Sequence, residues 1–100
     1  MRILAITACP TGIAHTYMAA EQLERAGRAL GHQIKVETQG AMGIENRLTE
    51  EDVAGADALV VASDVAIEGR DRFAGVARVL EIPIQQAIRN PAEVFARLQR

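Results

Sequence analysis

The sequence predicts an α/β fold, a single doubly wound domain over residues 1–100 in which helices cover both faces of a mainly parallel four-stranded sheet. Strand-like apolar stretches begin near residues 2, 33, 57 and 79, and helix-like segments lie between most of them. The connections are short, which favours parallel strands joined by right-handed crossovers. A length of 100 residues suits one hydrophobic core. With the first strand in the centre, the predicted strand order is 2-1-3-4, and the ligand crevice lies between the first and third strands.

The first strand is expected over residues 2–8, because residues 3–6 form a continuous apolar run typical of the buried centre of a parallel sheet. The first helix is expected over residues 14–30, and Gly31 provides its end. Along this helix, apolar residues recur mostly every three or four positions, which predicts that they face the core. They are Tyr17, Met18, Leu23, Ala26 and Leu30.

The second strand, residues 33–38, alternates polar and apolar side chains and is therefore placed nearer an edge. Residues 39–43 contain two glycines and are expected to form a backbone-permissive loop. Thr49 is the expected N-cap of a short helix, because Asp52 follows three residues later as in a capping box. Gly55 is expected to end this helix.

The third strand is expected over residues 57–63, and Asp64 follows its carboxyl end. Residues 65–75 are expected to form a loop with a helical turn around residues 68–73. A fourth strand is expected over residues 79–84, and Pro83 confines it to an edge or falls among its last residues, because proline cannot donate to a sheet ladder. Asn90 and Pro91 mark the start of a final helix that runs to about residue 98.

Composition excludes several classes of function. The formal net charge is −2 and basic patches are absent, so we expect no nucleic-acid partner. The longest strictly apolar run is residues 58–62, far below the roughly 20 residues needed to cross a bilayer, so we expect no transmembrane segment. No signal-like segment follows Met1, which favours a cytoplasmic location. We also expect no metal and no cofactor.

The segment from residue 7 to residue 16 carries the chemistry, because the single cysteine of the chain lies in it. Cys9 is expected at the carboxyl end of the central strand, where open α/β sheets bind ligands. Gly12 permits positive φ angles, and the helix starting near Ala14 directs its unpaired N–H groups toward the loop. Such a loop favours an anion, either a thiolate or a phosphoryl group bound to it.

Three kinds of cysteine chemistry are compatible with a phosphate-binding turn, and spacing separates them. A cysteine phosphatase needs an arginine at the sixth position after the cysteine, where this chain has His15. A redox pair needs a second cysteine where Gly12 stands. A nucleotide-binding loop needs a lysine that is missing. The remaining choice is a phosphoryl carrier, and its rival is a regulatory module that binds an anion without covalent chemistry.

Residues 9–21, CPTGIAHTYMAAE, resemble the phosphorylation-site signature of the fructose-family enzyme IIB of the bacterial phosphoenolpyruvate-dependent sugar phosphotransferase system. The resemblance continues through residues 36–40, 43–46, 48–49, 64–67 and 72–75, so it covers most of the chain. The chain departs from the family pattern at residues 76–78, where a lysine-proline pair would be expected.

The resemblance implies that the chain is a phosphotransferase working through a cysteinyl phosphate on Cys9. The cysteine would accept a phosphoryl group from a phosphohistidine of enzyme IIA. It would donate that group to a fructose-like sugar entering through the membrane-embedded enzyme IIC. The chain would then lie in the cytoplasm, held at the inner face of the membrane through enzyme IIC.

The phosphate-binding loop is predicted from the residues that follow the cysteine: Pro10, Thr11, Gly12, Ile13, Ala14, His15 and Thr16. Consecutive N–H groups of this loop can hold phosphoryl oxygens, and the proline stiffens the turn. His15 either contacts the phosphoryl group or keeps the cysteine ionised, or it is simply exposed. Thr11 either donates to phosphate or caps the helix.

Three charged residues outside the loop have alternative roles. Asp64 is expected opposite Cys9, where it either orients the loop and repels hydroxide or acts as an ordinary cap or turn residue. Arg70 and Arg72 are expected to be solvated, with steering of an acidic partner as the alternative.

Overall fold

A five-stranded sheet in the order β3-β2-β1-β4-β5 forms the centre of the computed structural model, which describes residues 1–10 and 14–99. All neighbouring strands run parallel except β3, which is antiparallel to β2. The strands are β1 (Arg2–Ala8), β2 (Gln33–Gly40), β3 (Gly43–Glu45), β4 (Ala58–Ser63) and β5 (Val79–Ile82). The four predicted strands therefore occur in the predicted order, with one further edge strand.

A longer β2 and the additional strand β3 replace most of the loop predicted at residues 39–43. β2 continues to Gly40 and pairs with Gly43, which leaves a two-residue turn of Ala41 and Met42. Gly43 has a φ of +90°, a conformation that residues with a side chain rarely adopt. The two glycines therefore flank a tight hairpin turn.

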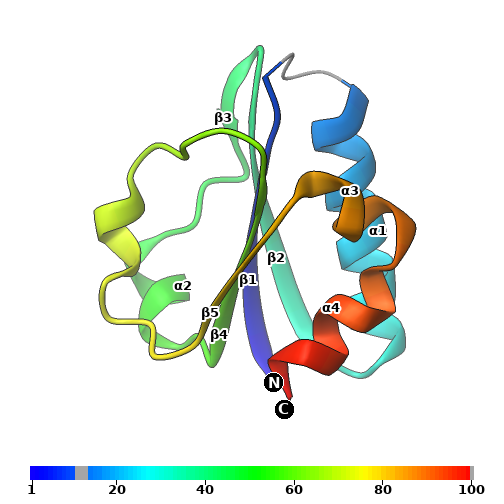
Figure 1. Ribbon diagram of the computed structural model, residues 1–100. Coiled ribbons are helices and arrows are strands. Elements are labelled where there is room, and N and C mark those ends of the chain that lie inside the picture. The colour runs from blue at the N-terminus through cyan, green and yellow to red at the C-terminus, as the bar shows by residue number, and fades with distance from the viewer. Residues whose placement is uncertain (11–13, 100) are drawn as a thin grey trace.

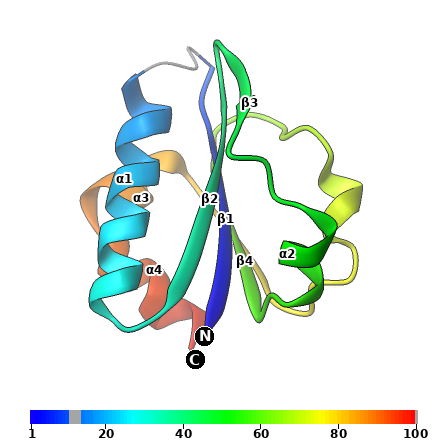
Figure 2. The same ribbon diagram turned by 180° about the vertical axis from the view of Figure 1, so that it is seen from behind.

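Helices cover both faces of the sheet, as predicted. On one face lie α1 (Ala14–Ala29), α3 (Ile84–Arg89) and α4 (Pro91–Leu98), and on the other lie α2 (Glu50–Ala54) and the 3-10 turn η1 (Arg70–Phe73) (Figures 1 and 2). The central strand β1 supplies both cores, because alternate side chains point to opposite faces. Ile3 and Ala5 pack under α1, and Leu4 and Ile6 pack toward α2.

The buried face of α1 differs from the predicted one. Tyr17 and Met18 are 38% and 48% exposed, and Leu30 is 53% exposed, so the expectation that they belong to the core was wrong. Leu23 is buried as predicted, and the other buried residues of the helix are Thr16, Ala19, Ala20 and Gly27. Their small side chains let the helix lie close to the sheet. A Cβ atom on Gly27 would lie 3.1 Å from the nearest side-chain atoms of Ile34 and Phe95.

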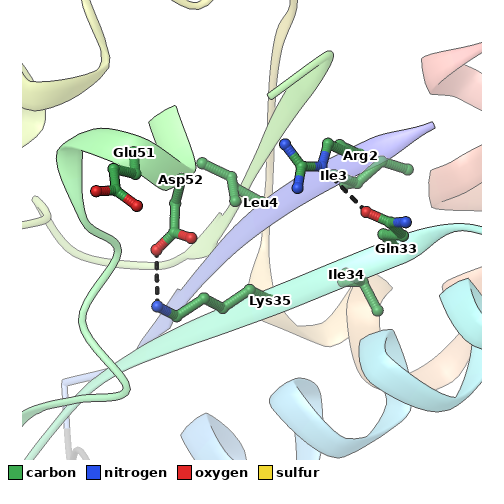
Figure 3. Close-up of a pocket in the computed structure, with 8 residues that line it drawn as sticks. All are labelled: Arg2, Ile3, Leu4, Gln33, Ile34, Lys35, Glu51 and Asp52. Carbon is green, nitrogen blue, oxygen red and sulfur yellow. Dashed lines mark hydrogen bonds and ion pairs between the residues drawn. The ribbon is translucent and has the colours of Figure 1, made fainter. Parts of the chain in front are cut away.

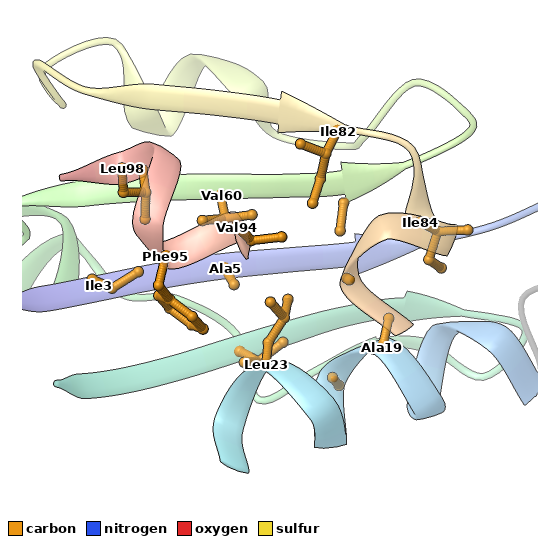
Figure 4. Close-up of a cluster of buried hydrophobic side chains, with 14 of the residues drawn as sticks. Ile3, Ala5, Ala19, Leu23, Val60, Ile82, Ile84, Val94, Phe95 and Leu98 are labelled. Atoms are coloured by element: carbon orange, nitrogen blue, oxygen red, sulfur yellow. The ribbon is translucent and has the colours of Figure 1, made fainter. Parts of the chain in front are cut away.

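The core under α1 is closed by the carboxyl-terminal helices. Phe95 and Leu98 of α4, Ile84 of α3 and Leu23 of α1 belong to one buried cluster, in which the Phe95 ring points toward Leu23 (Figure 4). Each of these side chains is 2% exposed or less, so each contributes about 1.5–3 kcal/mol of transfer free energy on burial.

Helix α3 was not predicted, because residues 79–84 were assigned to a strand. The strand ends at Ile82, and Pro83 is the N-cap of α3. Ile84, Ala87 and Ile88 have the spacing of a helical face, and this signal could have revealed the helix. The predicted final helix is confirmed as α4.

The second face is covered more thinly. The predicted capping box of α2 is confirmed: Asp52 N–H donates to the Thr49 hydroxyl, and the Asp52 carboxylate accepts from Thr49 N–H. Gly55 follows this helix as predicted.

No helix in the described ranges is long and apolar enough to span a bilayer.

Candidate functional site

Cys9 lies at the carboxyl edge of the sheet, directly after the central strand. The last residue of β1, Ala8, pairs with Gln39 of β2 and Ser63 of β4. The following residue, Cys9, therefore lies beyond the ends of three parallel strands, as predicted. It belongs to the core on the α1 face and is 6% exposed.

The first helical turn of α1 holds the sulfur. The Thr16 hydroxyl donates to Cys9 Sγ at 3.3 Å, and the Thr7 hydroxyl donates to the Thr16 carbonyl at 2.9 Å. Both threonines are fully buried. The central strand and the helix start are thus joined around Cys9, and the Thr16 hydroxyl contacts the sulfur itself.

Part of the predicted phosphate-binding loop falls outside the described residues, namely Thr11, Gly12 and Ile13. On either side of that gap, Pro10, Ala14 and His15 are exposed. The positive end of the α1 dipole lies at this same edge of the sheet and favours an anion there. The cysteine is therefore flanked by surface residues.

Asp64 follows β4 as predicted, and its side chain is tied to α3. Its Oδ1 atom accepts a hydrogen bond from Ile84 N–H at 3.2 Å. Because Ala8 pairs with Ser63, Asp64 and Cys9 both come next after paired residues of adjacent strands. The contact with α3 matches the alternative in which Asp64 caps a helix.

A buried ion pair lies on the other face of the sheet and was not foreseen. Arg72 was expected to be solvated, but its side chain is only 18% exposed. Its guanidinium donates two hydrogen bonds, of 2.8 and 2.9 Å, to the fully buried carboxylate of Glu37. The expectation was wrong because the two residues are 35 positions apart and only the fold brings them together. Arg70 is exposed, as expected, and pairs with Glu81.

The Glu37 carboxylate stays ionised because its hydrogen bonds outweigh its burial. Burial alone raises the pKa of Glu37, whereas hydrogen bonds from Arg72, Gln39 and the Leu48 N–H lower it, and the net pKa lies below its ordinary value. The same contact raises the pKa of Arg72. The pair is therefore charged at neutral pH.

This ion pair anchors the loop that follows β4. Arg72 donates to the Gly69 and Glu68 carbonyls, and the Gln39 side chain both donates to the Glu68 carbonyl and accepts from its N–H. A surface hollow of about 170 Å³ lies between this loop, the β2–β3 hairpin and Ala8. The network thus fixes the walls of the surface next to Cys9.

A second tie joins α1 to the edge strand. The Tyr17 hydroxyl donates to Glu45 of β3 at 2.6 Å, and this bond raises the pKa of Tyr17. Tyr17 therefore connects the first helical turns after the cysteine loop to the hairpin.

Another hollow, of about 290 Å³, lies at the opposite end of the sheet (Figure 3). The two cationic side chains that line this hollow both have polar partners. Lys35 forms an ion pair with Asp52 at 2.7 Å, and Arg2 donates a hydrogen bond to Gln33 at 3.0 Å. It is formed by the amino ends of β1 and β2 and is remote from Cys9.

Within residues 1–10 and 14–99, no three His, Cys, Asp or Glu side chains lie close enough together to hold a metal ion.

Comparison with known proteins decides the family. Residues 4–97 match the family model described as "PTS system, Lactose/Cellobiose specific IIB subunit", where PTS denotes the phosphotransferase system. The chain belongs to this PTS IIB family.

Within this family, the relatives are of the fructose-like type. The chain is 46% identical over 98 residues to the PTS system fructose-like EIIB component 2 of Escherichia coli K12, an alignment covering 98% of this chain and 92% of that one. It is 54% identical over 100 residues to the fructose-like PTS system EIIBC component of the same organism, covering 98% of this chain but only 20% of the relative. The chain thus spans one fifth of the length of that EIIBC relative.

A solved domain of the fructose-specific IIABC component of Borrelia burgdorferi has the same fold. It superposes with a TM-score of 0.91 at 42% identity, covering 97% of this chain and 91% of that one. The predicted family is confirmed, and the chain is an EIIB phosphocarrier of the fructose-like type.

Proposed function

We propose that Cys9 accepts a phosphoryl group from a phosphohistidine of an enzyme IIA partner and donates it to a fructose-like sugar entering through enzyme IIC. The observation that carries the proposal is the position of the sulfur, which lies at the carboxyl end of the central strand against the first turn of α1. Residues 1–100 act in this proposal as one IIB domain.

The two transfers are balanced reactions at phosphorus. In the first, the Cys9 thiolate attacks phosphorus, an S–P bond forms, the P–N bond breaks, and its electron pair remains on the imidazole nitrogen. In the second, a sugar hydroxyl oxygen attacks phosphorus and gives its proton to a base of the membrane partner or to water. An O–P bond forms, and the sulfur leaves as a thiolate. Both steps need mainly in-line positioning and compensation of charge.

The residues around the sulfur are placed to admit the phosphoryl group and to compensate its charge. Pro10, Ala14 and His15 lie at the surface, where an incoming phosphoryl group arrives. The positive end of α1 compensates its charge. Asp64 supports the site indirectly by anchoring the start of α3.

The relatives and the placement of the chain ends support the proposed partners and location. An EIIBC relative joins the IIB domain to a IIC component in one protein. The N-terminus and the end of α4 lie at the edge of the sheet opposite the cysteine (Figures 1 and 2). A domain attached at either end therefore leaves the cysteine edge accessible. We place the chain in the cytoplasm, held at the inner face of the membrane by enzyme IIC.

Covalent loading tests the proposal directly. Incubation with phosphoenolpyruvate and the upstream phosphotransfer proteins should add one phosphate mass to the peptide that carries Cys9. A Cys9→Ser variant should keep the fold, measured by circular dichroism, and should relay no phosphate to sugar. If the wild-type protein gains no mass while enzyme IIA is demonstrably phosphorylated, the carrier role is wrong and a non-covalent anion-binding module takes its place.

A further inference from the structure

Thr16 lies in the first turn of α1, next to the exposed His15 and Tyr17, yet its side chain has no exposed surface. Its hydroxyl donates to Cys9 Sγ at 3.3 Å. The Thr7 hydroxyl fixes the Thr16 backbone by donating to its carbonyl at 2.9 Å. The hydroxyl proton of Thr16 is therefore directed at the sulfur atom that takes part in both transfers.

We propose that Thr16 is a catalytic residue that stabilises the Cys9 thiolate, and so acts on the sulfur as the leaving group when the phosphoryl group departs. This role differs from holding phosphoryl oxygens, the role predicted for the loop as a whole. The inference rests on the proposed function of Cys9 as the phosphoryl carrier.

The strength of this hydrogen bond changes during the reaction. A donor bonds a charged acceptor more strongly than a neutral one. The sulfur is an anion when it attacks phosphorus and when it departs, whereas in the cysteinyl phosphate it is bonded to phosphorus and carries much less charge. The bond from Thr16 therefore strengthens as the S–P bond breaks, and an interaction that is stronger in the transition state than in the ground state accelerates the reaction.

Burial makes the hydroxyl difficult to replace. Cys9 is 6% exposed and Thr16 is fully buried, so bulk water does not surround the sulfur. In such an environment an electrostatic interaction counts for more than at the surface. The thiolate stabilisation also raises the tendency of the cysteinyl phosphate to pass on its phosphoryl group, as a carrier requires.

The first experiment measures the thiol itself and needs no partner protein. The alkylation rate of Cys9 by iodoacetamide, followed by intact mass against pH, gives the pH midpoint of the thiol. Thr16→Val removes the donor at nearly constant volume and should move the midpoint up by about one pH unit, so alkylation below the midpoint slows roughly tenfold. Thr16→Ser keeps the donor and should stay near wild type.

A matched control removes a different buried hydroxyl. Thr38 is 7% exposed and pairs with Thr7 in the sheet register, and Thr38→Val should leave the midpoint unchanged. The titratable side chains at this edge within the described residues, among them His15, Tyr17, Glu45, Asp64 and Glu68, are the same in every variant. If Thr16→Val does not fold, Thr16→Ala provides the same comparison. A folded Thr16→Val or Thr16→Ala protein with the wild-type alkylation profile overturns the proposal.

The second experiment measures the leaving group. Protein loaded on Cys9 is mixed with unphosphorylated enzyme IIA, and the loss of cysteinyl phosphate is followed with time. Thr16→Val should lose its phosphate roughly tenfold more slowly than wild type, and Thr16→Ser should lose it at a similar rate to wild type. Equal rates for all three proteins overturn the catalytic role. Failure of the wild type to load refutes the proposed function instead, and it does so independently of the alkylation profiles.

Discussion

Replacing Arg72 by methionine tests the buried ion pair that holds the loop after β4. The substitution keeps an unbranched side chain like the apolar stem of arginine but removes every donor that Arg72 directs at Glu37. Glu37 has no exposed surface, so water cannot replace the guanidinium without opening the structure. We expect Arg72→Met to be strongly destabilised.

The expected magnitude follows from leaving one member of a buried pair alone. Removing one partner of such a pair costs about 3–5 kcal/mol. Glu37 retains hydrogen bonds from Gln39 and the Leu48 N–H, which favours the lower end of that range. Because small domains have about 5–15 kcal/mol of stability in total, the thermal midpoint should fall by roughly 20 °C.

The pH dependence should change sign. In the wild type, the pKa of Glu37 is lowered, so its contribution to stability is complete above the ordinary glutamate pKa and is lost as the pH falls through the lowered value. Without Arg72, burial dominates and the pKa of Glu37 rises above the ordinary value. The stability deficit of the variant should therefore be largest at neutral pH and should shrink as the pH falls through that raised pKa.

Urea unfolding followed by circular dichroism at several pH values measures both effects. Glu37→Gln combined with Arg72→Met removes the uncompensated charge and should recover part of the loss. Arg70→Met, at an exposed arginine two positions away, should cost less than about 1 kcal/mol. If Arg72→Met costs no more than Arg70→Met, or if its deficit is independent of pH, the reasoning about the buried pair is wrong.

Three further substitutions test the cap, the core and the loop, each by urea unfolding. Thr49→Ala breaks the capping box with Asp52 and should cost about 1 kcal/mol; a cost near zero would show that the cap is not stabilising. Leu23→Ala opens a cavity in the fully buried core and should cost about 2–5 kcal/mol, whereas a surface-like cost would contradict its packing. Gly69→Ala should destabilise by more than about 1 kcal/mol, because Gly69 has a φ of +69° and a Cβ there would lie 2.6 Å from Arg72 Nε; wild-type stability would argue against this constraint.

Much of the fold could be predicted because its signals are local. The apolar run of residues 3–6 predicted the central strand, and Thr49 with Asp52 predicted the start of α2. The core face of α1 was predicted wrongly in part because large apolar residues were favoured: Leu23 is buried, but Ala19 and Gly27 are buried where Tyr17 and Met18 were expected. Which residues of α1 are buried depends on how closely the helix packs against the sheet. The helix sequence alone does not set that distance.

Part of the candidate site could also be predicted from the sequence, and part could not. The order of residues 9–16 predicted a cysteine at a strand end followed by a helix start, and the structure has Cys9 directly after β1 and the start of α1 at Ala14. Sequence could not show that the Thr16 hydroxyl points at the sulfur, because that direction depends on how α1 rotates against β1.

The sequence by itself determined the succession of strands and helices and the position of Cys9 at the end of β1, because these depend on patterns within a few consecutive residues, and it determined the IIB family through motifs spread over most of the chain. The tertiary structure alone decided which distant groups meet: Arg72 with Glu37, and Tyr17 with Glu45. Hydrogen bonds and ion pairs act over about 3 Å. Their partners are therefore fixed by where the folded sheet and helices bring side chains together, and not by their separation along the chain.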